Sequence, residues 1–399
     1  MIKIKDKTKC CGCSACVNIC PKTCIRMKAD DEGFAYPEVN TDLCINCGLC
    51  EKVCPIINNN PENEVKTVYA AGHKSAKIKT LSSSGGMFSL LAEHILNQGG
   101  AVFGAAFNGN WQVCHKYAET MEDLDKLRRS KYVQSDIGDS FKTTKDFLQK
   151  GRQVLFTGTP CQIAGLKNYL GKDYPNLLTA DIICHGVPSP AVWERFLAET
   201  APASNISAVD FRHKRFGWDS SYLAITLKDG RSLPEANGIL KYFKSFLYRS
   251  QGKLFRLIYR LPYTISNMYE RPSCHACAFK GKRKYADFTM ADLWGVKEVM
   301  PDMYDEKGVS LLMVNSAKAE AAFKDLAVNL LYKDISLEAV SKYNPYFLRS
   351  TSPSPCREEF FKSFRKGESF YKIMSRYKRR GVKGLLLKLL RLAGGAKIL

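Results

Sequence analysis

The stretch Cys10-Cys-Gly-Cys-Ser-Ala-Cys-Val-Asn-Ile-Cys-Pro21 decides the fold of the first part of the chain. Without Cys11 it has the form C-x2-C-x2-C-x3-C-P, and this spacing returns in Cys44-Ile-Asn-Cys-Gly-Leu-Cys-Glu-Lys-Val-Cys-Pro55. Three thiolates this close in one loop can hold three corners of an iron–sulfur cubane. The fourth, before proline, reaches the other cluster. The two stretches therefore predict two 4Fe–4S clusters with interleaved ligands.

Each predicted set takes three cysteines from one repeat and the last cysteine from the other. The first set is Cys10, Cys13, Cys16 and Cys54, and the second is Cys44, Cys47, Cys50 and Cys20. This spacing is typical of bacterial two-cluster ferredoxins, so we expect that fold for residues 1–58. Zinc is the alternative, but tetrahedral zinc sites favour paired C-x2-C units separated by longer loops. Cys11 and Cys24 are left over and are expected to fill the core.

The composition limits the remaining choices. The chain has 399 residues, of which 45% are hydrophobic and 25% charged. This is enough for two or three domains with a buried core. The sequence has neither a run of 18 apolar residues nor the apolar core of a signal peptide, so we expect a cytoplasmic protein. The formal charge of +21 makes nucleic acid, an anionic membrane surface and phosphorylated ligands the partners to consider.

Strands and helices are predicted to alternate after a polar linker at 58–63, which indicates an α/β body with a mixed sheet. The expected strands are 67–73, 101–107, 113–119, 154–157, 177–184, 209–212, 223–227, 288–291 and 310–315. The expected helices are 84–97, capped by Ser83 or Ser84, then 137–149, 161–170 and 317–331. We divide the chain into a ferredoxin domain at 1–58, body regions at 67–150 and 151–345, and a tail at 346–399.

Four later cysteines are candidates for a third metal site. Cys161 follows a short apolar strand, Cys184 ends another strand, and Cys274 and Cys277 form a C-x2-C pair. If these segments converge at one sheet edge, they supply four thiolates. The alternatives are a zinc site or separate buried thiols.

Two polar segments of the predicted body are candidates for binding a phosphorylated cofactor. Ser83, Ser84, Gly85 and Gly86 open a helix, whose N-terminus offers free amides and a positive dipole end. The motif is neither a Walker loop nor G-x-G-x-x-G, and a plain helix cap is the alternative. A second segment, 129–135, adds a cation, a ring and an amide, although a solvated basic loop explains it as well. Its candidate residues are Lys131, Tyr132 and Gln134.

Several stretches in order resemble one known family, the beta subunit of coenzyme F420-reducing hydrogenase and its relatives, in the form fused to an N-terminal two-cluster ferredoxin. The matching stretches are Ser83–Gly86, Ser130–Ser135, Phe156–Gln162, Asp181–Gly186, Phe211–Lys214 with Gly217-Trp218, Arg271–Cys277, Ala286-Asp287 and Asp292–Gly295.

The resemblance implies an iron–sulfur flavoprotein with FAD and one 4Fe–4S cluster in the body. It implies that Cys161, Cys184, Cys274 and Cys277 hold this cluster. It also implies that 83–86 and 131–134 contact FAD, with Thr157, Gly158 and Thr159 near the isoalloxazine ring. Cations that could hold an anionic substrate, or be ordinary surface charges, are Arg212, Lys214 and Arg271.

The expected function is an oxidoreductase that moves electrons between the clusters, FAD and a small molecule that exchanges hydride. The substrate is coenzyme F420 or another molecule, since some relatives resemble proteins encoded among polysaccharide-biosynthesis genes. The electron donor is a redox partner protein or a small molecule. The alternatives are a non-catalytic electron-transfer subunit and a metal-stabilised nucleic-acid binder. The last is disfavoured because no recognised binding module is present.

The end of the chain is strongly basic, with twelve Lys or Arg and one Glu over 362–399. Helical spacing places six apolar residues on one face, and Arg380, Lys388 and Arg391 on the other. This pattern predicts a basic amphipathic helix that lies on an anionic bilayer at its cytoplasmic face. Packing on the body or on a second subunit is the alternative. The apolar residues are Val382, Leu385, Leu386, Leu389, Leu390 and Leu392.

Overall fold

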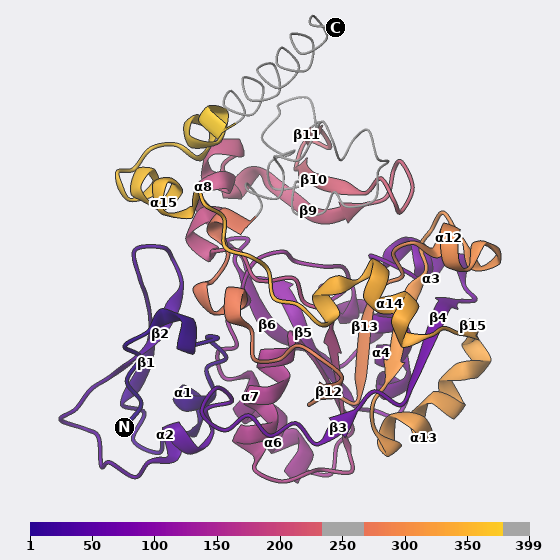
Figure 1. Ribbon diagram of the computed structural model, residues 1–399, viewed down its shortest axis with the longest axis horizontal. Helices are drawn as coiled ribbons and strands as arrows, with labels where there is room; N and C mark the ends of the chain where they lie inside the picture. Colours follow the sequence, from indigo (N-terminus) through magenta and orange to yellow (C-terminus); the bar gives the residue numbers. More distant parts are fainter. Residues whose placement is uncertain (234–266, 378–399) are drawn as a thin grey trace, which may run out of the picture.

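A computed structural model of the chain describes residues 1–233 and 267–377 (Figure 1). An N-terminal lobe lies beside a body built on a large mixed sheet, and a smaller lobe with its own sheet lies at one end of both. The fold class predicted from the sequence, a ferredoxin-like lobe followed by a mixed-sheet α/β body, is confirmed. The predicted amphipathic helix beyond residue 377 lies outside the described residues.

The N-terminal lobe contains a short hairpin and two short helices. The strands β1 (Ile25–Ala29) and β2 (Ala35–Val39) pair antiparallel. A 3-10 turn, η1 (Lys7–Lys9), precedes the first cysteine repeat. Each repeat runs into a helix, α1 (Ala15–Ile19) or α2 (Leu49–Lys52), so the cysteine loops lie at the helix starts.

The body sheet has eight strands in the order β15-β4-β14-β13-β8-β7-β5-β6. Its centre, β5-β7-β8-β13, is parallel, and the outer strands are antiparallel. The carboxyl ends of the parallel strands therefore meet at one edge, where α/β sheets place their ligands. The strands are β4 (Thr67–His73), β5 (Ala101–Phe107), β6 (Val113–Ala118), β7 (Val154–Thr157), β8 (Leu177–Ile182), β13 (Phe288–Asp292), β14 (Ser310–Val314) and β15 (Leu330–Asp334).

Helices cover both faces of this sheet, because alternate strand residues point to opposite sides. On one face α6 and α7 pack over Phe103 and Phe156, and α14 packs beyond them. On the other face α4 and α13 pack over Val102 and Leu155. The body helices are α3 (Ala76–Leu81), α4 (Met87–Leu96), α5 (Met121–Leu124), α6 (Ser140–Gln149), α7 (Pro160–Leu170), α12 (Val296–Val299), α13 (Ala317–Leu326) and α14 (Leu337–Tyr343). Short 3-10 turns are η5 (Pro272–Ala276), η6 (Pro301–Met303), η7 (Ala327–Asn329) and η8 (Pro345–Phe347).

The smaller lobe is held by an aromatic core. It consists of the sheet β11-β10-β9, with α8 and α15 packed beside it. Phe34 of the N-terminal hairpin is buried in the same core, which joins the two lobes. The bounds are α8 (Pro190–Thr200), η2 (Ala203–Asn205), β9 (Ile206–His213), β10 (Tyr222–Leu227), β11 (Ser232–Leu233), η4 (Asn267–Tyr269) and α15 (Arg357–Arg365). A further pair, β3 (Asn63–Glu64) with β12 (Arg283–Lys284), fastens the linker to the body.

Three predicted helix ends are wrong. The helix expected from residue 137 begins at Ser140. The helix expected from residue 84 begins at Met87, and its N-cap is Gly86 at φ 97 rather than a serine. Ser83 and Ser84 are engaged elsewhere, because their hydroxyls bond to Ser130 and to the carbonyl of Val309. The helix expected over 317–331 ends at Leu326, and residues from Leu330 onward form the edge strand β15.

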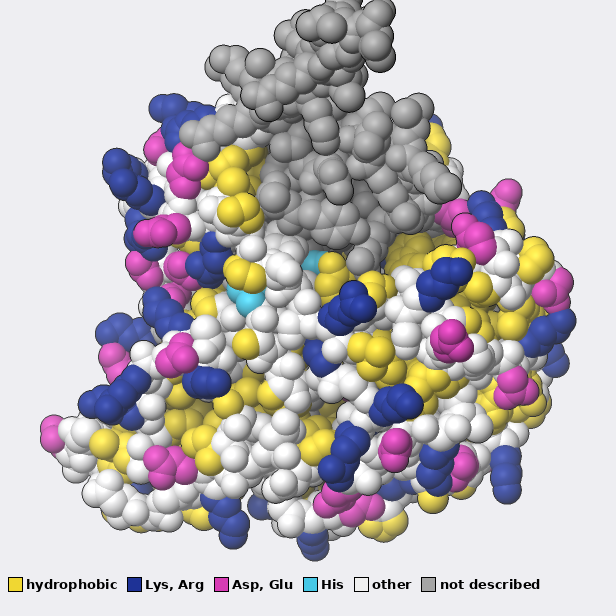
Figure 2. All heavy atoms as spheres, viewed as in Figure 1, with side chains coloured by type: hydrophobic (Ala, Val, Ile, Leu, Met, Phe, Trp, Pro, Cys, Tyr) yellow, Lys and Arg dark blue, Asp and Glu magenta, His cyan; other side chains and the backbone are white. Residues whose placement is uncertain are grey.

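Basic side chains are spread over the visible face. Figure 2 shows Lys and Arg interspersed with Asp and Glu there, with no single basic stripe. Many cations have acidic partners, such as Lys66 with Glu320 and Arg152 with Glu119. Within 1–233 and 267–377, no helix has the length and hydropathy needed to cross a bilayer.

Candidate functional site

The first predicted cysteine set surrounds a small cavity in the N-terminal lobe. Cys10, Cys13, Cys16 and Cys54 all line it, together with Cys11. Burial, and after it the neighbouring thiols of Cys10 and Cys54, raise the pKa of Cys16 to about 12. Bringing negative thiolates together in a buried place is costly unless a cation compensates them, so this donor set fits an iron–sulfur cluster.

The second predicted set surrounds another small cavity at the far side of the same lobe. Cys20, Cys44, Cys47 and Cys50 line it. The leftover Cys24 is buried beside them, with its sulfur 3.4 Å from that of Cys20. Across the described part of the chain, no three ligand-type side chains close on a point suited to a single ion.

The two sets differ in their distance from the body. Cys13 packs on α7, where a Cβ at Gly165 would lie 2.9 Å from the Cys13 sulfur. Asn18 of α1 also donates to the carbonyl of Gly138 at 2.9 Å. By contrast, Cys47 of the second set is exposed. The first set therefore faces the body, and the second faces outward.

The structure brings the four later cysteines together at the carboxyl edge of the sheet. Cys161 lies in the first turn of α7, Cys184 follows β8, and Cys274 and Cys277 lie in and after η5. Burial raises the pKa of Cys184 to about 12, with Cys161 and Cys277 among the groups that add to the shift. Burial and then Cys184 raise the pKa of Cys274 well above its ordinary value. These four thiols lie near enough to one another to interact electrostatically, although the sequence separates them widely.

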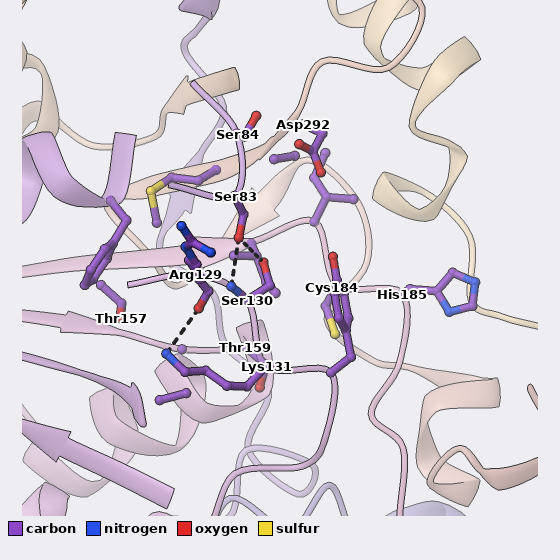
Figure 3. A pocket seen from close by; sticks show the side chains of 18 of the residues that line it. Ser83, Ser84, Arg129, Ser130, Lys131, Thr157, Thr159, Cys184, His185 and Asp292 are labelled. Carbon is purple, nitrogen blue, oxygen red and sulfur yellow. Dashed lines mark hydrogen bonds between the residues drawn. The ribbon is translucent and has the colours of Figure 1, made fainter. Parts of the chain in front are cut away.

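A cavity of about 360 Å³ opens beside these cysteines, within the range of roughly 300–1,000 Å³ that ligand pockets span. It lies at the carboxyl ends of β7, β8 and β13, and Cys184 is part of its wall (Figure 3). Predicted cofactor residues that line it are Ser83, Ser84, Gly86, Lys131, Tyr132, Thr157, Gly158 and Thr159.

The loop before α4 is fixed against the loop at 129–135. The backbone amide of Ser130 donates to the Ser83 hydroxyl at 2.8 Å. Gly85 lies behind the cavity, where a Cβ would be 2.7 Å from the carbonyl oxygen of Ala71. Its amide donates to the Ser310 hydroxyl at 2.8 Å. Gly85 is thus needed for the close approach of this loop to the sheet, and it is not among the cavity's lining residues.

Lys131 is a half-buried basic residue in the cavity wall. Its ammonium donates to backbone carbonyls after α5, the closest being that of Arg128 at 2.6 Å. Burial, and then the charge of Arg129, lower the pKa of Lys131 to about 7. Neighbouring Arg129 is itself paired with Asp210. An anion bound here would favour the charged form of Lys131.

Arg212 lines the cavity, whereas Lys214 lies behind it. The Arg212 guanidinium forms an ion pair with Asp292, with N–O distances of 2.9 and 3.2 Å. Burial disfavours its charge, but Asp292 and Tyr132 outweigh burial, so the pKa of Arg212 is raised. The Lys214 ammonium donates to the carbonyls of Lys79 and Ser84, at 2.9 and 3.0 Å. Burial lowers the pKa of Lys214 to about 7.

Two predicted site residues lie away from the cavity. Gln134 and Arg271 contact each other and the N-terminal lobe: the Arg271 Nη1 donates to the Gln134 Oε1 at 2.9 Å. The Gln134 amide donates to the carbonyl of Cys11 at 3.2 Å. Arg271 is therefore not placed to hold a substrate in the cavity, and Gln134 is not placed to touch a cofactor there.

Sequence reasoning missed His115 and the role of Asp292, which both line the cavity. His115 bonds to the Ser135 hydroxyl at 2.6 Å and to the carbonyl of Thr157 at 3.0 Å. Burial lowers its pKa to about 4, so it is neutral near pH 7. Asp292 could have been found by its place at the end of a predicted strand. His115 lies within an edge strand, and no sequence pattern distinguishes it.

Comparisons with known proteins agree with this geometry. Residues 151–337 match the family described as the C terminus of the coenzyme F420 hydrogenase/dehydrogenase beta subunit, and residues 9–57 match the 4Fe-4S dicluster domain. The chain thus contains, in order, a stretch that matches a dicluster ferredoxin domain and a stretch that matches the C terminus of the coenzyme F420 hydrogenase/dehydrogenase beta subunit. The resemblance expected from the sequence is thereby confirmed.

Several known proteins are similar to parts of the chain. A component of the F420H2 dehydrogenase of Methanosarcina mazei is 24% identical over 162 residues, which is 38% of this chain and 46% of that protein. The ferredoxin 7Fe of Hydrogenibacillus schlegelii is 42% identical over 43 residues, 11% of this chain and 49% of that protein. The chain thus spans about half the length of these two relatives. A chain in the structure of the F420-reducing NiFe hydrogenase complex from Methanosarcina barkeri aligns with a TM-score of 0.45 and 16% identity, covering 71% of this chain and 89% of that one.

Proposed function

We propose that the chain is an iron–sulfur flavoprotein oxidoreductase. It exchanges hydride with a small molecule at the cavity that Cys184 borders, and single electrons with a redox partner through its ferredoxin lobe. One observation carries this proposal: the cavity has Cys184 in its wall, and Cys161, Cys274 and Cys277 are neighbours of that thiol. A ligand in the cavity would therefore lie next to a third four-thiolate site.

The cavity residues fit FAD. Small side chains at Ser83, Ser84 and Gly86 leave room for a phosphate near the start of α4. Lys131 supplies a half-buried amine without a carboxylate partner among the described residues, and a bound phosphate would favour its charged form. Ile182, Met290 and Trp294 provide apolar surface for a flat ring. When bound, FAD would connect two-electron hydride chemistry with one-electron cluster chemistry.

The chain's own residues would bind, orient and exclude water. Neutral His115 fixes the end of β7 through the carbonyl of Thr157 and itself carries no charge near pH 7. The buried pair of Arg212 and Asp292 holds the opposite wall, and Trp218 Nε1 donates to Asp292 at 2.6 Å. The arrangement positions a cofactor and needs no acid–base side chain for hydride exchange.

We further propose that the small molecule is coenzyme F420 or another anionic hydride carrier. Two facts support this: the beta-subunit domain matches at 151–337, and a similar protein is named as part of an F420H2 dehydrogenase. A role in polysaccharide biosynthesis, a cytoplasmic location and membrane contact through the tail stay predictions.

Metal and flavin analysis of the anaerobically purified protein tests the proposal. We expect one FAD and about twelve irons per chain, four for each of three clusters. Replacing Cys161 with alanine should remove about four irons and leave about eight. Replacing Cys114, which lies outside all three thiol groups, should leave the iron content and the FAD content unchanged. Eight irons and no flavin after FAD is added back would contradict the flavoenzyme and favour a role in electron transfer alone.

A further inference from the structure

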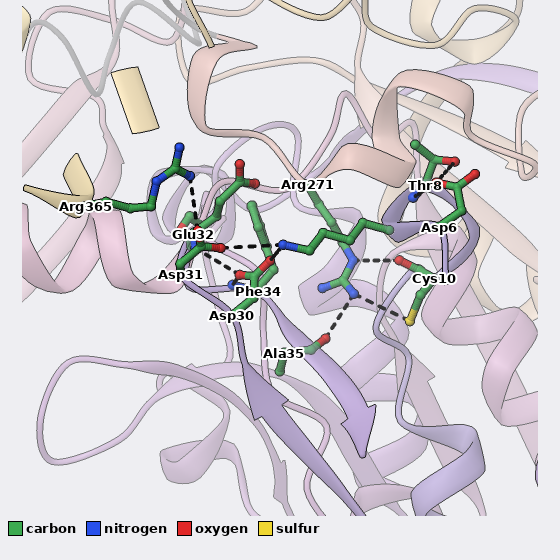
Figure 4. Close-up of polar contacts among 12 residues, drawn as sticks. Asp6, Thr8, Cys10, Asp30, Asp31, Glu32, Phe34, Ala35, Arg271 and Arg365 are labelled. Atoms are coloured by element: carbon green, nitrogen blue, oxygen red, sulfur yellow. Dashed lines mark hydrogen bonds and ion pairs between the residues drawn. The ribbon is translucent and has the colours of Figure 1, made fainter. Parts of the chain in front are cut away.

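Arg271 connects the body to the first cysteine set of the ferredoxin lobe. Its Nε donates to the carbonyl of Cys10 at 2.8 Å, and its Nη2 lies 3.5 Å from the Cys10 sulfur (Figure 4). The same Nη2 donates to the carbonyl of Ala35 at 3.0 Å, and Nη1 donates to Gln134. The guanidinium also lies over the Tyr36 ring, 4.4 Å from its centre. Five contacts fix this side chain in one position.

The charge of Arg271 has no carboxylate partner in the part of the chain that the structure describes. The residue is 0% exposed, and within 1–233 and 267–377 no Asp or Glu forms an ion pair with it. A buried, uncompensated cation is expensive. The nearest group that becomes anionic is the Cys10 thiolate, which is a ligand of the first set. The guanidinium is therefore placed to compensate the negative charge of a cluster bound there.

Arg271 is also joined to the cysteines of the body. Its carbonyl accepts a hydrogen bond at 2.9 Å from the amide of Cys274, and its own amide donates to the carbonyl of Val187. A short path thus runs from the Cys10 sulfur through one residue to a thiol of the third site. Cys11 also lies near both sites, because the pKa of its buried thiol is affected by Cys13 of the first set and by Cys161 of the third.

We propose that Arg271 is a positioning residue for electron transfer between the ferredoxin lobe and the body. It raises the reduction potential of the cluster held by Cys10 and keeps that cluster against the third site. The physical reason is that one-electron reduction adds negative charge to the cluster, which a nearby cation and an N–H···S contact stabilise. This inference rests on the proposed assignment of Cys10 to the first cluster.

Redox titrations followed by electron paramagnetic resonance test the inference on the whole protein. In Arg271→Gln we expect the midpoint potential of the cluster held by Cys10 to fall. The midpoint potentials of the other clusters should stay unchanged. A change of about ten-fold in the equilibrium that shares one electron between the two ferredoxin clusters corresponds to a shift of about 59 mV in midpoint potential. Arg271→Lys keeps the positive charge but loses the forked contacts of the guanidinium. The midpoint potential of the same cluster should therefore fall less than in Arg271→Gln.

Arg357→Gln is the matched control. Arg357 joins the smaller lobe to the ferredoxin lobe, where it binds Glu32 with N–O distances of 2.7 and 2.5 Å and, among the described residues, no cysteine sulfur. Its loss weakens another contact that holds the ferredoxin lobe in place and should leave all midpoint potentials unchanged. An equal fall in Arg357→Gln and Arg271→Gln would show a merely structural effect and overturn the proposal. So would unchanged midpoints in Arg271→Gln. If Arg271→Gln does not fold, the test rests on Arg271→Lys. Unchanged midpoint potentials in that variant overturn the proposal, and a fall in the midpoint potential of one cluster supports it.

The assignment of Cys10 is tested separately. Cys10→Ser should alter or remove the signal that shifts in the Arg271 variants. If Cys10→Ser leaves that signal intact, the ligand assignment fails, whatever the Arg271 variants do. If the body holds no third cluster, the proposed function loses its support, while the shift in potential is still expected.

Discussion

Gly12 and Gly48 occupy the same position in the two cysteine repeats but meet different surroundings. Both have a left-handed backbone, with φ of 69° and 74°. A Cβ at Gly12 would lie 2.6 Å from the Gln134 amide and 2.7 Å from the Arg271 guanidinium, whereas nothing lies within 4 Å of one at Gly48. The first glycine therefore serves the contact with the body as well as the turn.

Replacing each glycine with alanine separates these two roles. Gly48→Ala should cost roughly 1–2 kcal/mol for the left-handed backbone alone. Gly12→Ala should cost a further 1–3 kcal/mol or so, because the new methyl group crowds two fixed side chains. Unfolding of the two iron-loaded variants, compared under the same anaerobic conditions, measures the difference. Equal losses of stability would show that Arg271 and Gln134 move away at no cost.

Burial of His115 predicts a pH dependence of stability. Its pKa is lowered from 6.5 to about 4 in the folded chain. The unfolded chain takes up this proton near pH 6.5, so the stabilisation is full above that pH and is lost as the pH falls toward 4. At 1.36 kcal/mol per pH unit, the loss is about 3 kcal/mol. Denaturation of the wild type and of His115→Gln at several pH values checks this, since the two curves should converge on acidification. Parallel curves would exclude His115 as the source.

At this scale the sequence predicted the chemistry of residues better than their contacts. Cysteines in a fixed local spacing have few partners, so their grouping follows from the chain itself. Arg212 and Arg271 look alike in sequence, because each is a cation in a polar segment. Their surroundings come from distant segments: Asp292 is 80 residues from Arg212, and Cys10 is 261 residues from Arg271. No local pattern carries that information.

The elements of the body were predictable where the hydrophobic pattern was strong. The strand predicted at 154–157 is present because Val154, Leu155 and Phe156 are fully buried. The end of α13 was missed because leucines at 330 and 331 continue a helical pattern. In the structure Leu330 is buried while Leu331 is exposed, which is the alternation of an edge strand. Tertiary pairing with β4 decides this segment.

The described part of the basic tail is a packed element. In α15, Phe360 and Phe361 are fully buried in the aromatic core of the smaller lobe, and the following segment adds Phe370, Ile373 and Met374. We expect Phe360→Ala to lower the free energy of unfolding by about 3–5 kcal/mol. Tyr371 is 52% exposed, so Tyr371→Ala should change the free energy of unfolding by less than about 0.5 kcal/mol. A denaturant titration compares them, and similar small effects would mean that α15 is dispensable for folding.

Across the whole molecule the three thiol groups form a series from solvent to the cavity. The second set includes exposed Cys47 and lies near Leu43 and Ile45, whose side chains are 55% and 56% exposed. The first set packs on α7, and the third borders the cavity. An external protein donor would meet the second set first, whereas a small hydride carrier would enter the cavity directly.

This order predicts that the cluster of the second cysteine set is needed for electron transfer from a protein donor, but not for hydride exchange with a small molecule. In the double variant Cys44→Ala and Cys47→Ala, flavin reduction by a protein donor should slow at least ten-fold, because the outer relay is missing. Reduction by a small-molecule hydride donor should keep its wild-type rate, since the proposed hydride site lies beside the body cysteines. Stopped-flow absorbance of the flavin measures both rates, with Cys114→Ala as the control that should change neither. Equal slowing of both reactions would contradict the series, and so would an unchanged rate with the protein donor.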